Sequence, residues 1–177
     1  MTRAARPVRS SALKIDVMVD CKRWKDTKRL KSIVLRAVTR AAAATRSTRG
    51  AELAIVLTDD SAIRALNRDW RGIDKATNVL SFPAESGNPK PHLGDIVLAY
   101  ETIEREARGE HKPFAHHVAH LAVHGFLHLL GYDHARGKDA LKMEQVERDI
   151  LRQLKIPDPY GREPAGKKTP SKLSQKS

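Results

Sequence analysis

The chain carries the sequence His-Gly-Phe-Leu-His-Leu-Leu-Gly-Tyr-Asp-His from residue 124 to residue 134. Between residues 118 and 130, every residue is apolar or glycine except His120, His124 and His128. Apolar side chains on all sides are typical of a buried helix, and the four-residue spacing places the three histidines on one face of it. Because buried polar side chains need partners, this face is predicted to bind a metal ion.

The spacing of His124, His128 and His134 favours zinc. Gly131 supplies a left-handed stop for the helix, and the chain then returns with His134. Catalytic zinc sites commonly have three protein ligands and one open position, so one zinc ion per chain is expected. The spacing is similar to the metzincin pattern H-E-x-x-H-x-x-G-x-x-H, but Gly125 stands where those metalloproteases carry their general-base glutamate. The alternative is that the histidines are ordinary core residues.

Three more residues are candidates for orienting the ligand histidines, since such ligands usually donate their second ring N–H to a carboxylate or a carbonyl. Asp95 is expected on a strand that could lie beside the histidine helix. Asp133 could be such a partner or only a turn residue. His120 could support the ligands or only pack in the core. The histidines at the start of the helix are expected to be solvated, namely His111, His116 and His117.

The composition indicates a basic protein without membrane-spanning segments. Lysine and arginine total 33 against 21 acidic residues, which gives a net charge of +12. Such a charge attracts polyanions such as RNA, and with two Trp, three Tyr and three Phe we expect phosphate contacts rather than base stacking to dominate. No apolar run approaches the length of a transmembrane helix. Cys21 is the single cysteine, which excludes an intrachain disulfide and fits a reducing compartment such as the cytoplasm.

The pattern of apolar residues predicts one α+β domain over residues 12–160, with a basic extension at 1–11 and a basic, disordered tail at 161–177. A small mixed sheet is expected, with helices packed on it and the buried histidine helix at the centre. The expected strands cover 13–19, 53–57, 79–82 and 93–99. The expected helices cover 27–45, about 61–70 after a cap within 58–61, 101–108, 113–130 and 139–154.

Motifs spread along the chain agree with one known family. They are Leu66-Asn67, Trp70-Arg71-Gly72, Asp74, residues 77–83, residues 93–96, residues 124–134, Met143-Glu144, Glu147 and residues 158–160. Over about residues 13–160 the chain resembles the YbeY family, the bacterial endoribonucleases also called rRNA maturation factors. The histidine motif is highly specific, and residues 77–83 support the resemblance independently.

The resemblance implies a zincin-like fold, a zinc ion held by His124, His128 and His134, and cleavage of single-stranded RNA. It also implies 16S rRNA 3′-end processing and ribosome quality control, with ribosomal particles as partners. The functional arginine of the family falls on Arg71, whose planar guanidinium could stabilise phosphate charge. Without the resemblance, the expected interpretation of Arg71 is an ordinary loop arginine. The zinc would supply an activated water or a Lewis acid at the phosphodiester.

Two other functions stay open. A metalloprotease-like zinc hydrolase follows from the histidine spacing alone, and Gly125 argues against it. A non-catalytic ribosome-assembly factor would use the zinc only to hold its fold.

Overall fold

The computed structural model describes residues 12–45, 50–85, 92–133 and 137–161. Their elements are β1 (Lys14–Val19), α1 (Thr27–Thr45), β2 (Glu52–Thr58), α2 (Asp60–Arg71), β3 (Val79–Pro83), β4 (His92–Ala99), α3 (Tyr100–Gly109), α4 (Phe114–Leu129) and α5 (Gly137–Gln153). The α+β class and the small mixed sheet are confirmed, and each strand and helix begins and ends close to the expected residue. The basic ends at 1–11 and 162–177 lie outside the described residues, and so does His134.

The strands form one four-stranded sheet in the order β1-β2-β4-β3. β1 and β2 are parallel and so are β2 and β4, whereas β3 runs antiparallel to β4 and forms one edge of the sheet. Parallel neighbours need a long crossover connection, which α1 provides between β1 and β2. No helix within the described ranges is both long enough and apolar enough to cross a membrane.

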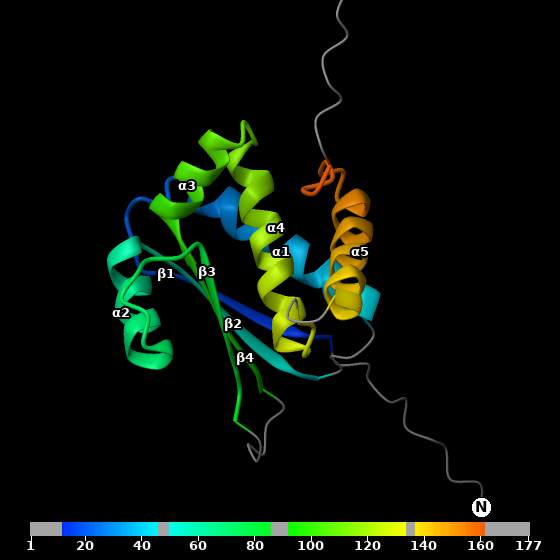
Figure 1. Cartoon of the computed structure of the whole chain (residues 1–177), viewed down its shortest axis with the longest axis horizontal. Helices are drawn as coiled ribbons and strands as arrows, with labels where there is room; N and C mark the ends of the chain where they lie inside the picture. Colours follow the sequence, from blue (N-terminus) through cyan, green and yellow to red (C-terminus); the bar gives the residue numbers. More distant parts are fainter. Residues whose placement is uncertain (1–11, 46–49, 86–91, 134–136, 162–177) are drawn as a thin grey trace, which may run out of the picture.

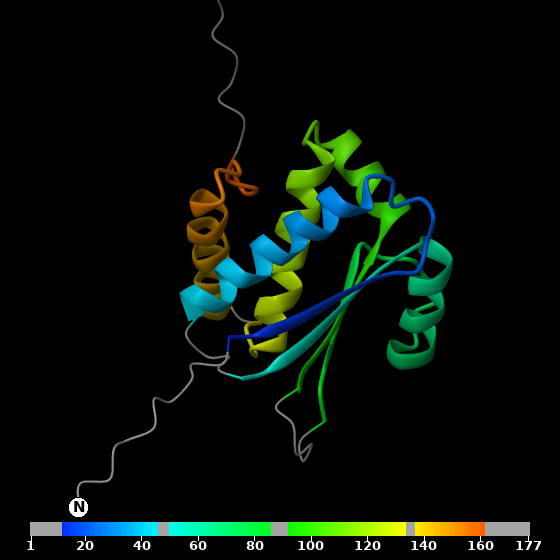
Figure 2. The same cartoon turned by 180° about the vertical axis from the view of Figure 1, so that it is seen from behind.

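The helices cover the two faces of the sheet unequally. Figures 1 and 2 show α1, α4 and α5 on one side of the sheet and α2 on the other. The alternation of side chains along β4 separates two apolar clusters, with Ile96 and Leu98 in the large cluster beside α4 and Val97 and Ala99 in the small cluster beside α2. Residues next to each other on β4 therefore face different helices.

Helix α4 lies at the centre of the larger layer, where it contacts α1, α3, α5, β3 and β4. Its apolar sides are buried, and Val118, Ala122 and Phe126 are fully inaccessible. The histidine face is only partly buried, since the side chains of His120 and His124 are 14% and 21% exposed. This differs from the expected burial on all sides. On this face, His124 and His120 approach Glu147 of α5.

Candidate metal centre

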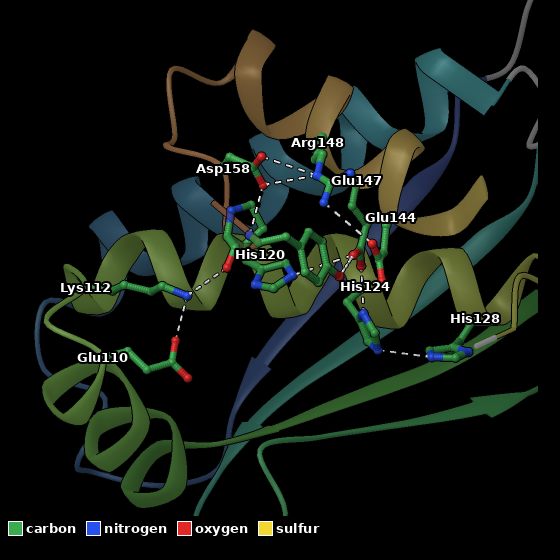
Figure 3. Close-up of polar contacts among 11 residues, drawn as sticks. Glu110, Lys112, His120, His124, His128, Glu144, Glu147, Arg148 and Asp158 are labelled. Carbon is green, nitrogen blue, oxygen red and sulfur yellow. Dashed lines mark hydrogen bonds and ion pairs between the residues drawn. The ribbon is translucent and has the colours of Figure 1, made fainter. Parts of the chain in front are cut away.

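The histidine face of α4 meets a buried glutamate of α5. Glu147 is 0% exposed, and its Oε1 lies 2.7 Å from Nδ1 of His124. Its Oε2 accepts a hydrogen bond from the hydroxyl of Tyr160 and lies 3.7 Å from Nε2 of His120 (Figure 3). An ionised carboxylate can only accept hydrogen bonds, so Nδ1 of His124 carries the hydrogen. In the neutral imidazole, Nε2 of His124 then carries the lone pair that a metal ligand needs.

Two ring nitrogens of α4 converge at this place. Nε2 of His124 and Nε2 of His128 are 3.1 Å apart (Figure 3). Two nitrogens bound at about 2.0–2.1 Å to one tetrahedral zinc ion lie about 3.4 Å from each other, so the pair needs only a small adjustment to share a metal. The same distance also fits a hydrogen bond between the rings. The third expected ligand, His134, lies outside the described residues.

A second grouping of possible ligand atoms overlaps with the first. His120, His124 and Glu147 each offer one ligand atom, and these atoms lie within 4.8 Å of one another, so this group could hold a metal ion. Two ligands of one metal ion are normally about 3 Å or more apart. The 2.7 Å between Nδ1 of His124 and Oε1 of Glu147 is a hydrogen-bond distance instead. This second group would have to give up that hydrogen bond to bind a metal through both atoms.

The surroundings of Glu147 strongly favour its ionised form. Burial by itself raises the pKa of this carboxyl group, but interactions with His120, His124 and Tyr160 outweigh the burial and lower the pKa to about 2. Burial and the neighbouring Glu147 carboxylate in turn raise the pKa of the Tyr160 hydroxyl. Tyr160 is therefore the hydrogen donor and Glu147 the acceptor over the whole neutral range of pH.

This shift predicts an acid-sensitive step in the stability of the metal-free protein. The pKa of Glu147 falls from 4.5 to about 2 on folding, so ionised Glu147 stabilises the folded state above pH ~4.5 and loses this contribution as the pH falls towards about 2. The loss amounts to roughly 3 kcal/mol. Urea unfolding at a series of pH values should show a smaller acid loss for Glu147→Gln than for the wild type. Parallel pH dependences of the two proteins would refute the prediction.

Arg71 lies at the end of α2, close to the edge strand β3. The helix begins after the Asp59 cap, whose side chain accepts from the N–H of Ala62 at 2.9 Å, and ends at Gly72 with a left-handed φ of 71°. Nη2 of Arg71 donates to the carbonyl of Ser81 on β3 at 3.3 Å. The exposed guanidinium of Arg71 is thereby held at the edge of the sheet.

Ser81 connects this edge to α4. Its hydroxyl donates to the carbonyl of Gly125 at 3.0 Å, one residue after His124. The guanidinium of Arg71 contacts the backbone carbonyl of the same Ser81. Arg71 therefore lies across one strand from the middle of the histidine helix. This arrangement brings together two parts of the chain that are about fifty residues apart in the sequence.

The expectation for Asp95 is wrong. Its carboxylate lies 3.2 Å from Nε2 of His92, its side chain is 50% exposed, and it lines a groove with Val97 on the α2 side of the sheet. The neighbouring Ile96 is the residue that meets α4. Asp95 therefore faces away from the histidines and cannot orient them. Asp133 is exposed just beyond the end of α4, and its role stays a prediction.

The expectation of a solvated His117 is also wrong. This side chain is 6% exposed, and its Nε2 donates to Oε2 of Glu106 at 2.8 Å, on the neighbouring helix α3. The sequence reasoning also missed the position of Glu147. The available signal was its helical spacing, because Glu147 falls on the same face of α5 as Met143 and Ile150, both fully buried. A single acidic residue on an apolar face points to a buried partner.

The fold and the site define an α+β protein with a candidate metal centre on its central helix. A family model described as Endoribonuclease YbeY matches residues 18–155. An Endoribonuclease YbeY of Nitrobacter hamburgensis is 54% identical over 157 residues, which are 84% of this chain and 82% of the relative. The Endoribonuclease YbeY of Rhodopseudomonas palustris strain BisB18 is 52% identical over 167 residues, 90% of this chain and 96% of the relative. The chain therefore belongs to the YbeY family of endoribonucleases, which are RNA-cleaving hydrolases.

The resemblance inferred from the motifs is thus confirmed at the level of the family. Among solved structures, a solution structure of a Thermotoga maritima protein matches with a TM-score of 0.49 at 23% sequence identity, covering 84% of this chain and 99% of that chain.

Proposed function

We propose that this protein is a zinc-dependent endoribonuclease that cleaves single-stranded RNA, with one zinc ion held by His124, His128 and His134. The observation that carries the proposal is the convergence of Nε2 of His124 and Nε2 of His128 at 3.1 Å. His134 is included because its spacing after Gly131 completes a three-histidine set. In this proposal the fold is zincin-like, and α4 is the helix that supplies the first two ligands.

The two placed histidines fit a zinc ion by their chemistry as well as by distance. Imidazole nitrogens are good zinc ligands, and three of them leave one position open for water or substrate. Glu147 takes the Nδ1–H of His124, which leaves Nε2 available as a lone-pair donor. A bound zinc ion would supply water activation and Lewis-acid polarisation at a phosphodiester.

Arg71 is the proposed catalytic residue of the chain. Phosphodiester cleavage builds negative charge on the phosphate, and a preorganised guanidinium stabilises such charge. Arg71 is exposed at the β3 edge and makes one hydrogen bond of 3.3 Å to the carbonyl of Ser81. It can exchange this contact for a phosphate without leaving an unpaired buried charge. The hydroxyl of Ser81 also donates to the carbonyl of Gly125 on α4 at 3.0 Å, so an RNA strand at this edge could contact both Arg71 and α4.

The proposed cellular work is rRNA maturation in the cytoplasm, including 16S rRNA 3′-end processing and ribosome quality control, with ribosomal particles as partners. Family membership supports this role, and so does the net charge of +12, which favours association with RNA. Asp133 and His120 are further proposed partners around the ligands. His120 lies beside Glu147, with Nε2 3.7 Å from Oε2.

The test combines metal analysis with cleavage by matched arginine variants. Purified protein should contain about one zinc per chain and should cleave single-stranded RNA in preference to duplex RNA. A chelator should abolish cleavage, and added zinc should restore it. Arg71→Ala should lower kcat by about 10²–10³-fold with unchanged zinc content. Arg71→Lys should recover only part of the activity, because lysine lacks the planar fork.

Arg68→Ala is the control for this test. Arg68 lies on the same helix and pairs with Asp69 at 2.9 Å, so its removal should change only a surface ion pair. Equal losses for the Arg68 and Arg71 variants would indicate a general charge effect instead of a catalytic one. Zinc-containing protein that binds ribosomal particles but never cleaves RNA would instead identify a structural assembly factor.

A further inference from the structure

Glu147 is the most deeply buried charged residue among those the structure describes, and it does not have the usual kind of partner. Its side chain is 0% exposed. Its contacts are Nδ1 of His124 at 2.7 Å, Nε2 of His120 at 3.7 Å and the hydroxyl of Tyr160, instead of a lysine or an arginine. A buried carboxylate costs several kcal/mol unless its surroundings compensate. Two of these three contacts, His124 and His120, lie on the face of α4 that carries the candidate metal ligands.

We propose that Glu147 is a positioning residue of the metal centre. By accepting the Nδ1–H of His124, it fixes the tautomer and the ring orientation of that histidine, and so directs Nε2 of His124 towards Nε2 of His128. The inference rests on the metal-binding role proposed above for His124. It extends the centre to α5, where Glu147 lies 23 residues after His124 in the sequence.

A positioning role explains the geometry better than a role as metal ligand. Both carboxylate oxygens already have hydrogen-bond partners, Oε1 with His124 and Oε2 with Tyr160. A ligand role would require Nδ1 of His124 to lose its hydrogen and Nε2 to turn away from His128. The observed arrangement is the one found around metal-bound histidines, where a carboxylate accepts the N–H that is not used for the metal.

The turn after α5 holds this carboxylate in place. Tyr160 donates its hydroxyl to Glu147, and its backbone N–H donates to Oδ1 of Asp158 at 2.9 Å. Asp158 also pairs with Arg148 at 3.3 Å, and the Arg148 guanidinium lies 5.1 Å from the centre of the Tyr160 ring. Figure 3 shows this network above the histidine face of α4. The end of the domain therefore belongs to the metal centre, and Tyr160 restricts the rotation of Glu147.

Glu147→Met and Glu147→Gln test the inference by metal affinity. Methionine has a similar shape but no oxygen acceptor, whereas glutamine keeps a carbonyl that can accept the same N–H. We expect zinc affinity, measured by competition with a chromophoric chelator, to fall about 10–100-fold in Glu147→Met and less in Glu147→Gln. The absorption bands of the Co²⁺-substituted variants should keep the wild-type shape, because the ligands are the same. Tyr160→Phe, which removes only one hydroxyl, should lower the affinity by a smaller factor.

A second readout needs no metal. Long-range ¹⁵N–¹H NMR of the imidazoles at mildly alkaline pH, where histidine is neutral, should show His124 as the Nδ1–H tautomer in the wild type and a shift towards Nε2–H in Glu147→Met. Asp149→Asn is the matched control, since Asp149 lies on the same helix and pairs with Arg152 at 2.9 Å on the surface. It should change neither readout.

Three outcomes would overturn the inference. They are unchanged zinc affinity in a folded Glu147→Met protein, changed Co²⁺ band shapes that indicate loss of a ligand, and an unchanged His124 tautomer. If Glu147→Met does not fold, unchanged zinc affinity in Tyr160→Phe and Glu147→Gln together would also overturn it. Failure of the proposed function would look different, because the wild-type protein itself would then bind no metal or cleave no RNA.

Discussion

Replacing His128 with alanine should abolish both metal binding and RNA cleavage, whereas replacing His120 should only reduce them. Both histidines lie on the same face of α4, one on each side of His124, so sequence spacing alone does not separate them. The positions of the ring nitrogens distinguish His128 from His120, because Nε2 of His128 is 3.1 Å from Nε2 of His124. His120 instead approaches Glu147 at 3.7 Å. Removing a ligand should cost more than the 10–100-fold that is typical for removing a residue that supports a ligand.

The measurement is zinc content by mass spectrometry or atomic absorption, together with cleavage of a single-stranded RNA by proteins purified side by side. Parallel purification matters because trace nucleases would give the same residual activity in every preparation. His92→Ala serves as the control, since His92 pairs with Asp95 at 3.2 Å, away from α4. The reverse ranking, with metal lost in His120→Ala and kept in His128→Ala, would favour the group formed by His120, His124 and Glu147.

Much of the fold could be predicted because its signals are local. The alternation of apolar residues in the strands and the helical spacing in α1, α4 and α5 are properties of neighbouring residues, and they located each element closely. The shared face of His120, His124 and His128 follows from the helical repeat in the same way. Arg71, in contrast, could be predicted only through the family resemblance. Its contact with Ser81 joins α2 to β3, and no local pattern of residues indicates that contact.

The errors concern contacts between elements that are distant in the sequence. Alternation along β4 shows that Asp95 and Ile96 point to opposite faces, but it does not tell which face α4 covers. The structure places Ile96 towards α4, so Asp95 was assigned to the wrong side. The sequence pattern predicts a solvated His117, because its partner, Glu106, lies on a different helix, α3. Such pairings depend on how the helices pack, which no short motif of this chain specifies.

Gly125→Glu, which restores the metzincin-like pattern, should prevent stable folding instead of creating a protease. A Cβ atom at residue 125 would lie 3.0 Å from Cγ2 of Ile96, 3.0 Å from Oγ of Ser81 and 3.3 Å from Cγ2 of Val79. Glycine therefore allows α4 to pack closely on β3 and β4. A glutamate would add further atoms and a charge inside this contact, and overpacking together with an uncompensated buried charge should cost at least about 3 kcal/mol.

The matched control for this variant is Gly137→Glu. A Cβ at Gly137 meets nothing within 4 Å, and an acidic side chain suits the first turn of a helix such as α5. In urea unfolding, the midpoint of Gly137→Glu should therefore lie close to that of the wild type. The midpoint of Gly125→Glu should lie at a much lower urea concentration, or the protein should be unfolded without urea.

A stable Gly125→Glu protein that gains chelator-sensitive peptide cleavage would contradict this prediction and support the metalloprotease hypothesis. The close packing makes that result incompatible with the observed fold, because residue 125 faces β3 and β4, whereas the His124 ring contacts Glu147 on α5. The missing glutamate is thus explained by helix packing, and the proton acceptor for RNA cleavage has to come from another position.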